Sequence, residues 1–220
     1  MKNKLLFIIV IAIVMNGSCK KDPAEENTYP TDGLVSYFNF DDNLTDQVGT
    51  TPNGTNNGSA AFIEGKAEKA ISLSGSGQYI EFPRKTFRSG NNISVSVWFK
   101  RTGSAGLYFI MCNDFGAFTH ADGYAGMAIS VPDTQNAHGT INKNEWTHLA
   151  GTYDGTNIRT YINGVLKETK SWPGTISGVD ENLKVGMFSD EYWSGAVDDL
   201  FIYNKVLSQS EVDQLYNYHK

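Results

Sequence analysis

The sequence predicts an all-β protein of two antiparallel sheets packed face to face, with one short C-terminal helix. Short apolar or alternating segments, separated by turn-forming residues, recur along most of the chain. Aromatic residues make up 12% of the 220 residues and 22 are glycine, a composition that favours strands and turns. A helical pattern occurs only at the C-terminal end, so the crossover helices that parallel strands require are not available. A sandwich of antiparallel sheets is the remaining solution.

Residues 1–18 are predicted to be a signal peptide. Lys2 and Lys4 precede an apolar run over residues 5–15, which is too short for a membrane span and suits a signal sequence. Gly17 and Ser18 then precede Cys19. This arrangement resembles a bacterial lipoprotein signal, which implies that Cys19 is lipidated and becomes the mature N-terminus. Ordinary secretion is the alternative.

Residues 19–32 are polar and charged and are expected to form a flexible tether. Charged residues directly after the cysteine resemble the export signals of surface-exposed lipoproteins in the Bacteroidetes. The expected location is therefore the outer membrane, exposed at the surface; the periplasmic face or secretion is the alternative.

The overall charge is acidic. The formal charge is −6, and it becomes −8 without residues 1–18, which carry two lysines and no acidic residue. An acidic surface argues against nucleic acid and against charge-driven binding to anionic lipid. Contact with the membrane is expected through the lipid anchor only.

Residues 33–220 are predicted to form one domain. Its first half contains apolar or alternating segments that read as strands at 34–40, 70–73, 78–82, 93–100 and 107–112. Residues 41–59 are rich in Asn, Gly, Thr and Asp and predict a long loop. Cys112 lies in the apolar run 107–112 and is expected to be a small buried side chain. Because a lipidated Cys19 cannot pair with it, no internal disulfide is expected.

In the second half, residues 113–126 are expected to form a loop with glycines and aromatic side chains, followed by a strand at 127–131. Residues 144–167 predict three strands joined by Asp154-Gly155 and Asn163-Gly164, dipeptides that tolerate the positive φ of tight turns. Further strands are expected at 183–187 and 195–203. Ser208 as N-cap with Glu211 three residues later predicts a helix from about 209 to 218.

Four segments in this order resemble the laminin-G-like, concanavalin A-like family: 34–49, 70–99, 146–167 and 195–208. The resemblance implies a jelly-roll sandwich, an extracellular location and often a structural calcium ion. Members of this family include carbohydrate-binding modules, adhesion domains and accessory modules of glycan-degrading systems.

Acidic residues at two positions suggest a calcium site. Asp41, Asp42 and Asp46 follow the first strand, and Asp198 lies on the last. If Leu200 and Ile202 face the core, alternation places Asp198 on the same side, where a carboxylate needs a partner. Ca²⁺ prefers carboxylate and carbonyl oxygens. The resemblance implies that first-loop and last-strand acids lie together and hold calcium; the alternative is that these acids are solvated and bind no ion.

Aromatic and polar residues suggest a glycan site. Sugars stack on exposed rings and form hydrogen bonds with amides and carboxylates. The residues selected for this role are Asn113, Phe115, Phe118, Asp122, Tyr124 and Trp193. For each ring, packing in the core or in a loop is the competing interpretation.

No catalytic motif is complete in this sequence. Some enzymes of the resembled fold carry Glu-x-Asp-x-x-Glu on one strand, but here Glu211 and Asp213 are followed by Tyr216 and fall on the expected helix. The four histidines show no metal-ligand spacing, and no nucleophile elbow or phosphate-binding loop occurs. We therefore expect a non-catalytic surface protein that binds a glycan or polysaccharide. The alternative is an adhesion or structural subunit that binds a surface protein.

Overall fold

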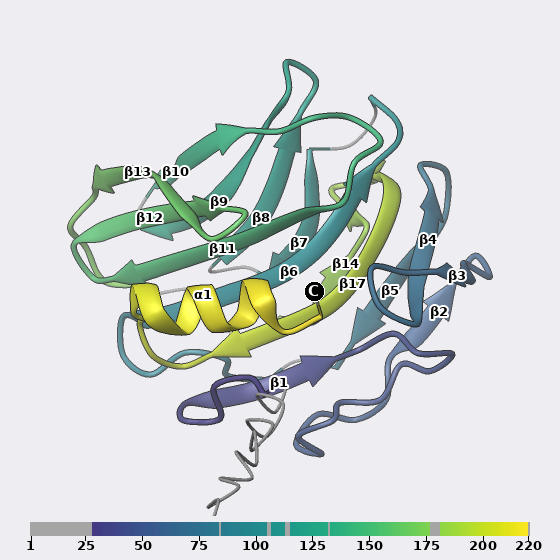
Figure 1. Ribbon diagram of the computed structural model, residues 1–220, viewed down its shortest axis with the longest axis horizontal. Coiled ribbons are helices and arrows are strands. Elements are labelled where there is room, and N and C mark those ends of the chain that lie inside the picture. Colours follow the sequence, from purple (N-terminus) through teal and green to yellow (C-terminus); the bar gives the residue numbers. More distant parts are fainter. Residues whose placement is uncertain are drawn as a thin grey trace, which may run out of the picture.

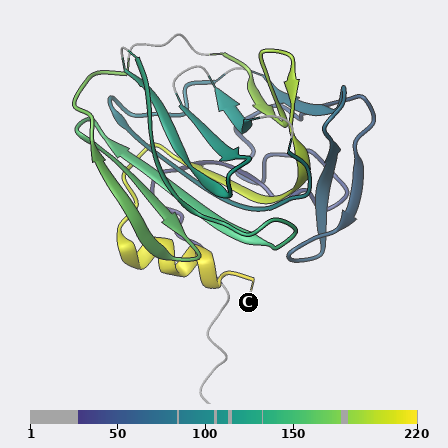
Figure 2. The same ribbon diagram turned by 90° about the horizontal axis from the view of Figure 1, so that it is seen from above.

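The computed structural model describes residues 28–83, 85–104, 107–112, 115–131, 133–176 and 181–219. These residues form a sandwich of two large antiparallel sheets, with one helix outside it (Figures 1 and 2). The predicted all-β jelly-roll architecture is confirmed. No helix among the described residues has the length and apolar character needed to cross a membrane.

The larger sheet has eight strands in the order β13-β12-β11-β6-β17-β4-β3, with β1 paired to β17. Its strands are β1 (Leu34–Phe38), β3 (Ala61–Glu64), β4 (Lys69–Ser74), β6 (Asn92–Arg101), β11 (Thr147–Asp154), β12 (Asn157–Ile162), β13 (Val165–Ser171) and β17 (Ser194–Tyr203). The N-terminal half of β17 pairs with β4 and its C-terminal half with β1. Strand β17 therefore changes partner along one edge.

The second sheet has seven strands in the order β10-β9-β8-β7-β14-β5-β2. Its strands are β2 (Thr55–Asn57), β5 (Tyr79–Phe82), β7 (Tyr108–Cys112), β8 (Phe115–His120), β9 (Tyr124–Val131), β10 (Asp133–Thr140) and β14 (Leu183–Val185). A separate hairpin consists of β15 (Met187–Phe188) and β16 (Glu191–Tyr192).

The main core lies between the two sheets. Alternation along β6 sends Ile93, Val95, Val97 and Phe99 into this core, as the period-two pattern predicts. Side chains of β7, β8 and β9 meet them from the second sheet. Cys112 is buried in the same core.

A smaller apolar cluster covers the outer face of the larger sheet. Helix α1 (Gln209–Asn217) lies outside the sandwich (Figure 2). It packs Val212 and Leu215 against residues that include Phe201 and Tyr203 of β17. Ser208 and Glu211 form the predicted capping box, which satisfies N–H groups at the start of the helix. The helix was expected at about this position.

Both predicted tight turns are present. Gly155 has φ 85°, and Asn163 and Gly164 have φ 51° and 78°. These positive values are the conformation that Asn and Gly adopt at low cost, and the two turns connect β11 to β12 and β12 to β13, the second pair with a shift in register at Thr160 and Tyr161.

Three segments differ from expectation. The predicted loop at 113–126 contains β8 and the start of β9, and β10 follows in a segment of weak apolar character. Strands β2 and β3 lie within or just after the predicted long loop. These polar strands form because neighbouring strands supply hydrogen-bond partners, an effect that local composition does not reveal.

The ordered domain also begins earlier than expected. The tether was predicted to extend to residue 32, but Tyr29 packs in the outer cluster beside Tyr37 and Phe201. Tyr203 Oη donates to the Pro30 carbonyl at 2.9 Å, and Lys205 Nζ lies 2.6 Å from Asp32 Oδ2. Residues 28–32 are thus part of the folded unit.

Candidate functional site

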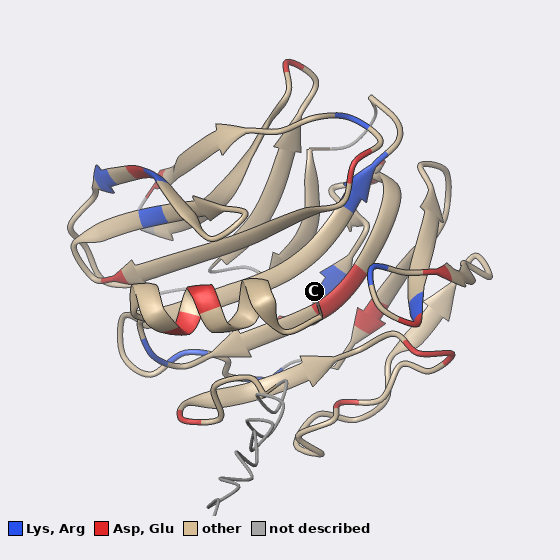
Figure 3. Ribbon diagram, in the orientation of Figure 1, with Lys and Arg blue, Asp and Glu red and all other residues tan. Residues whose placement is uncertain are grey.

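The first candidate site lies where β17 changes partner from β4 to β1. Val197 pairs with Ile71 of β4, and Leu200 pairs with Phe38 of β1. Asp198 and Asp199 fall between these pairs, at a bulge in the pairing with β6, and Asp199 has φ 47°. Figure 3 shows this acidic segment in the middle of β17, close to the end of the chain.

The bulge changes which way Asp198 faces. Val197 and Leu200 both enter the core, so simple alternation is interrupted between them. Asp198 pairs with Trp98, whose ring contacts Tyr216 of α1 on the outer face. The expectation that Asp198 shares the inward side of Leu200 and Ile202 is therefore wrong.

Two carboxylates in this region hold the turn between β3 and β4. Asp198 Oδ2 accepts hydrogen bonds from the backbone N–H groups of Lys66 (2.8 Å) and Ala67 (3.2 Å). Asp41 Oδ1 accepts one from the N–H of Lys69 (2.9 Å), and its Oδ2 accepts one from Asn39 Nδ2 (2.7 Å). These oxygens are already engaged by the protein.

Asp199 is only partly satisfied. Its side chain is 3% exposed, and its Oδ1 accepts a hydrogen bond from Tyr37 Oη at 2.6 Å. Its Oδ2 is buried and accepts no hydrogen bond. His219 Nε2 lies 3.4 Å from Oδ2, which is an ion pair only if the imidazole is protonated.

Burial gives these groups unusual acidities. Desolvation, together with the charge of Asp199, raises the pKa of Asp198 to about 8. Desolvation, partly offset by the hydrogen bond from Tyr37, raises the pKa of Asp199 to about 7. Burial lowers the pKa of His219. The ionised carboxylates therefore lack sufficient positive charge around them.

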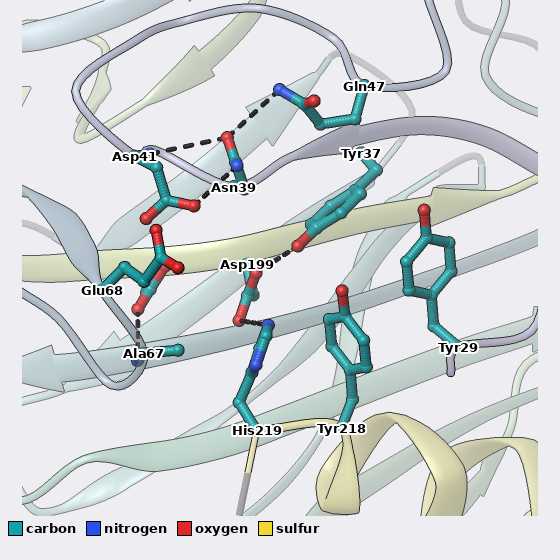
Figure 4. Close-up of a pocket in the computed structure, with 11 residues that line it drawn as sticks. Tyr29, Tyr37, Asn39, Asp41, Gln47, Ala67, Glu68, Asp199, Tyr218 and His219 are labelled. Atoms are coloured by element: carbon teal, nitrogen blue, oxygen red, sulfur yellow. Dashed lines mark hydrogen bonds and ion pairs between the residues drawn. The ribbon is translucent and has the colours of Figure 1, made fainter. Parts of the chain in front are cut away.

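These side chains line a cavity of about 370 Å³, here called the acidic cavity (Figure 4). Four carboxylates line it, from Asp41, Glu68, Asp198 and Asp199. Three tyrosines (Tyr29, Tyr37, Tyr218), Asn39, Gln47 and His219 contribute further polar groups. No Lys or Arg is among the described residues that line it. Such a cavity attracts cations.

The four acids predicted as calcium ligands have different positions. Asp41 and Asp198 share the acidic cavity, whereas Asp42 is exposed and outside its lining. Asp46 is buried elsewhere and accepts hydrogen bonds from the N–H groups of Tyr37 (3.0 Å), Val48 (3.1 Å) and Thr51 (2.9 Å). Its carboxylate anchors the loop that follows β1.

A calcium shell is not preformed in the cavity. Among the described residues, no three Asp, Glu, His or Cys side chains are arranged to hold one metal ion. Calcium binding here stays a prediction. Asp199 and Glu68 also line the cavity but were not predicted from the sequence. The position of Asp199 next to Asp198 could have suggested it, but the bulge that brings both into one cavity cannot be recognised in the sequence.

A second cavity, of about 570 Å³, lies at one end of the sandwich and is here called the rim cavity. The end of β8 and the β15–β16 hairpin form opposite parts of its wall. The lining side chains that can recognise a ligand are His120, Asp190, Glu191 and Tyr192. Buried Arg101 donates to the carbonyls of His120 and Ser104, two lining residues, and so fixes the wall from behind.

Three aromatic residues predicted to contact a glycan are buried instead. Phe115 and Phe118 are 2% and 3% exposed, and Trp193 is 0% exposed, with its Nε1–H donating to Thr119 Oγ1 at 2.8 Å. Phe115 and Phe118 lie on β8, a central strand rather than a loop: Phe115 enters the core between the sheets, and Phe118 packs beside the rings of Tyr108 and Tyr124 on the neighbouring strands. Trp193 follows β16 and stacks on Phe109 in the core. Their rings offer no free face to a sugar.

Tyr124 is half-buried between two histidines. His120 stacks on it with ring centroids 4.6 Å apart and planes 6° apart, and the centroid of His138 also lies 4.6 Å away. Tyr124 is not among the residues that line the rim cavity, whereas its neighbour His120 is. Asp122 is exposed and lies 3.2 Å from His120 Nδ1. Asn113 and Cys19 lie outside the described residues.

A family model described as the concanavalin A-like lectin/glucanases superfamily matches residues 74–213. The chain belongs to this superfamily. The match covers most of the strands of both sheets and reaches into α1. No curated protein matches the chain.

Several solved protein structures are similar to this chain. Domain 4 of AbnA, an extracellular GH43 arabinanase of Geobacillus stearothermophilus in complex with arabinotriose, is 26% identical with a TM-score of 0.71; the alignment covers 83% of this chain and 98% of that domain.

Two toxin domains show the same fold at lower identity. The receptor-binding domain of botulinum neurotoxin C/D mosaic is 17% identical (TM-score 0.70), with 84% of this chain and 51% of that one covered. A structure of botulinum neurotoxin type C, whose cell entry depends on two ganglioside molecules, is 14% identical (TM-score 0.70), with 86% and 52% covered. The chain spans about half of these two domains, and at these identities the likeness concerns the fold alone.

Proposed function

We propose that this protein is a non-catalytic carbohydrate-binding module that captures an oligosaccharide in the rim cavity. The observation that carries the proposal is the combination of Tyr192 and His120 with the carboxylates of Asp190 and Glu191 around one cavity. Aromatic faces stack on sugar rings, and carboxylates accept hydrogen bonds from hydroxyl groups. A cavity of about 570 Å³ is in the range of ligand sites.

The comparison with the arabinanase domain supports this proposal and suggests a first probe. That domain is similar to nearly the whole folded part of this chain, and its structure contains arabinotriose. We therefore choose arabino-oligosaccharides as the first ligands to test, followed by a broader glycan array.

The acids that resemble a catalytic motif have structural tasks, which favours a binding role over catalysis. Glu211 closes the capping box of α1 and lies 2.7 Å from Lys205 Nζ. Asp213 accepts a hydrogen bond from Gln209 on the same helix. Neither residue lines the rim cavity.

The test compares two aromatic residues of one hairpin. Tyr192→Ala removes a ring that lines the rim cavity, whereas Phe188→Ala removes a partly exposed ring that packs on Tyr108 outside the lining. We expect Tyr192→Ala to weaken oligosaccharide binding roughly tenfold or more, as loss of an aromatic contact implies, and Phe188→Ala to leave it unchanged. Calorimetry measures both. Equal binding by wild type and Tyr192→Ala, or no binding of any glycan on the array, would contradict the proposal.

A protein partner is the alternative function. Val165 and Leu166 are 56% and 44% exposed, next to each other on the edge strand β13. An exposed edge strand can pair with another chain. Two side chains make a small apolar surface, so the glycan role has more support.

We further propose that the module is anchored as a lipoprotein through Cys19 and displayed at the outer surface of the outer membrane. The support is the sequence of residues 1–21, with its basic start, apolar run and charged residues after the cysteine. Secretion without a lipid is the alternative.

A further inference from the structure

The acidic cavity shares no lining residue with the rim cavity, and its chemistry is different. It brings together four carboxylates and no Lys or Arg among its described lining residues. Lys66 is nearby, but its ammonium group donates to the His219 carbonyl at 3.2 Å and lies 4.8 Å from the centre of the Trp98 ring. The ammonium of Lys66 is thus directed to other groups, and the imidazole of His219 is the cationic or neutral group beside Asp199 Oδ2.

One acceptor in the cavity makes no hydrogen bond. Asp199 Oδ2 is buried and has only His219 Nε2 beside it, at 3.4 Å, whereas the other oxygen of the same carboxylate accepts a hydrogen bond from Tyr37. Burial lowers the pKa of His219, which favours a neutral imidazole that leaves the carboxylate charge unbalanced. A buried acceptor without a donor is costly, so a ligand that supplies an N–H or O–H group there is favoured.

The geometry is less suited to a bare metal ion. Ca²⁺ requires six to eight oxygens at 2.3–2.6 Å, which must converge on one point. The Asp198 Oδ2 and both oxygens of Asp41 are engaged by backbone or amide N–H groups. The cavity volume of about 370 Å³ also exceeds that of one water, roughly 30 Å³, about tenfold.

The remaining lining is polar and aromatic. The Asn39 amide is engaged by Asp41 and Gln47, whereas Gln47 is exposed and can bring its amide oxygen to a ligand; Tyr29 and Tyr218 are half-buried at the edge of the cavity (Figure 4). Amides suit the hydroxyl groups of a sugar, and tyrosine rings attract a nearby cation.

We infer that the acidic cavity binds an amino sugar, whose primary ammonium group donates a hydrogen bond to Asp199 Oδ2 between the four carboxylates. A primary ammonium carries a positive charge and three N–H donors, which match the free acceptor and the negative lining. This inference does not depend on glycan binding in the rim cavity.

The experiment titrates the purified full-length protein with glucosamine by calorimetry at neutral pH and fixed ionic strength. N-acetylglucosamine is the matched ligand control because it has the same ring without the charge. Asp199→Asn removes the charge from the free acceptor, and Asn tolerates the φ of 47° at this position. Asp42→Asn is the matched protein control, because Asp42 also has positive φ (54°) but is exposed and outside the lining.

We expect glucosamine to bind the wild type, N-acetylglucosamine to bind at least roughly tenfold more weakly, and Asp199→Asn to lose a similar factor, as for one charged hydrogen bond. Asp42→Asn should bind as the wild type does. If Asp199→Asn fails to fold, Glu68→Gln, at an exposed lining residue, should still weaken glucosamine binding.

Three results would overturn the inference. These are equal binding of both sugars, glucosamine binding that is unchanged in the folded Asp199→Asn or Glu68→Gln variant, and a response of the wild type to CaCl₂ but not to glucosamine. The last result would instead support the calcium prediction.

Discussion

At the residue scale, the acids of this domain perform separate tasks although they are close in sequence. Asp41 holds the β3–β4 turn, Asp42 is exposed, and Asp46 anchors the loop after β1. Burial alone would raise the pKa of Asp46, but N–H donors from Tyr37, Val48 and Thr51, with the hydroxyl of Thr51, lower it below its ordinary value. The number of backbone donors around a carboxylate therefore distinguishes an acid that holds the fold, such as Asp46, from one that can still interact with a ligand.

The role of Asp46 predicts a large stability loss on neutralisation. Asp46→Asn leaves one side-chain oxygen to accept the hydrogen bonds that two carboxylate oxygens now accept from backbone N–H groups. It also places an amide NH₂ group, itself a donor, among those donors. We expect the free energy of unfolding to fall by about 1–3 kcal/mol, measured by chemical denaturation. Asp42→Asn should change it by less than about 0.5 kcal/mol. Equal effects of the two substitutions would show that the hydrogen bonds of Asp46 contribute no stability.

At the scale of the element, β17 determines the chemistry of the acidic cavity. Its bulge interrupts alternation and places Asp198 and Asp199 beside the first residues of β4 and the last residues of β1. A regular strand would direct alternate residues to the core and would not present two neighbouring carboxylates to one cavity. In the folded state β17 therefore holds two carboxylates whose ionisation is unfavourable.

This charge predicts a pH dependence of stability. The pKa values of Asp198 and Asp199, about 8 and about 7 when folded, exceed the ordinary value of about 3.9 expected in the unfolded chain. Between these values the folded protein binds more protons, so its stability falls as pH rises from about 4 to about 8. The melting temperature should therefore decrease from pH 5 to pH 8.5.

The Asp198→Asn variant isolates this effect. Asn keeps a carbonyl oxygen that can accept from Lys66 and Ala67 but removes one charge of the pair. We expect its melting temperature to change less with pH than that of the wild type, with a difference on the order of a few kcal/mol in unfolding free energy across the range. If the melting temperatures of the variant and the wild type changed in parallel with pH, ionisation of Asp198 would not destabilise the folded protein.

At the scale of the whole molecule, both ends of the described chain meet on one face. Tyr29 near the start contacts Tyr218 near the end, with ring centroids 5.0 Å apart, on the outer face of the larger sheet. The rim cavity belongs to the other part of the sandwich, at the β8 and β15–β16 ends.

The proposed anchor predicts where the molecule is found in the cell. Wild-type protein should incorporate a radiolabelled fatty acid and sediment with outer membranes, and Cys19→Ser should do neither, because a serine cannot be lipidated through a thioether. Protease treatment of intact cells should digest the wild-type protein if it is surface-exposed. A membrane-bound Cys19→Ser protein would contradict anchoring through this residue.

Local features were predictable from the sequence, because they depend on residues that are neighbours in the chain. The turns at Gly155 and Asn163-Gly164 require positive φ, and Ser208 with Glu211 caps a helix within one turn. Alternation along β6 likewise gives its core face directly. Together with the four family-like segments, these features were sufficient for the fold.

The sites were decided by the tertiary structure. Phe118 is buried because Tyr108 and Tyr124 on the neighbouring strands pack beside its ring, Asp198 faces outward at a bulge between distant strands, and Asp199 and Glu68 meet only when β4 and β17 pair. Each of these facts depends on contacts between residues far apart in the chain, which local composition does not encode. The sequence by itself therefore determined an all-β sandwich with a capped helix, and the packing of its strands decided which side chains remain available to a ligand.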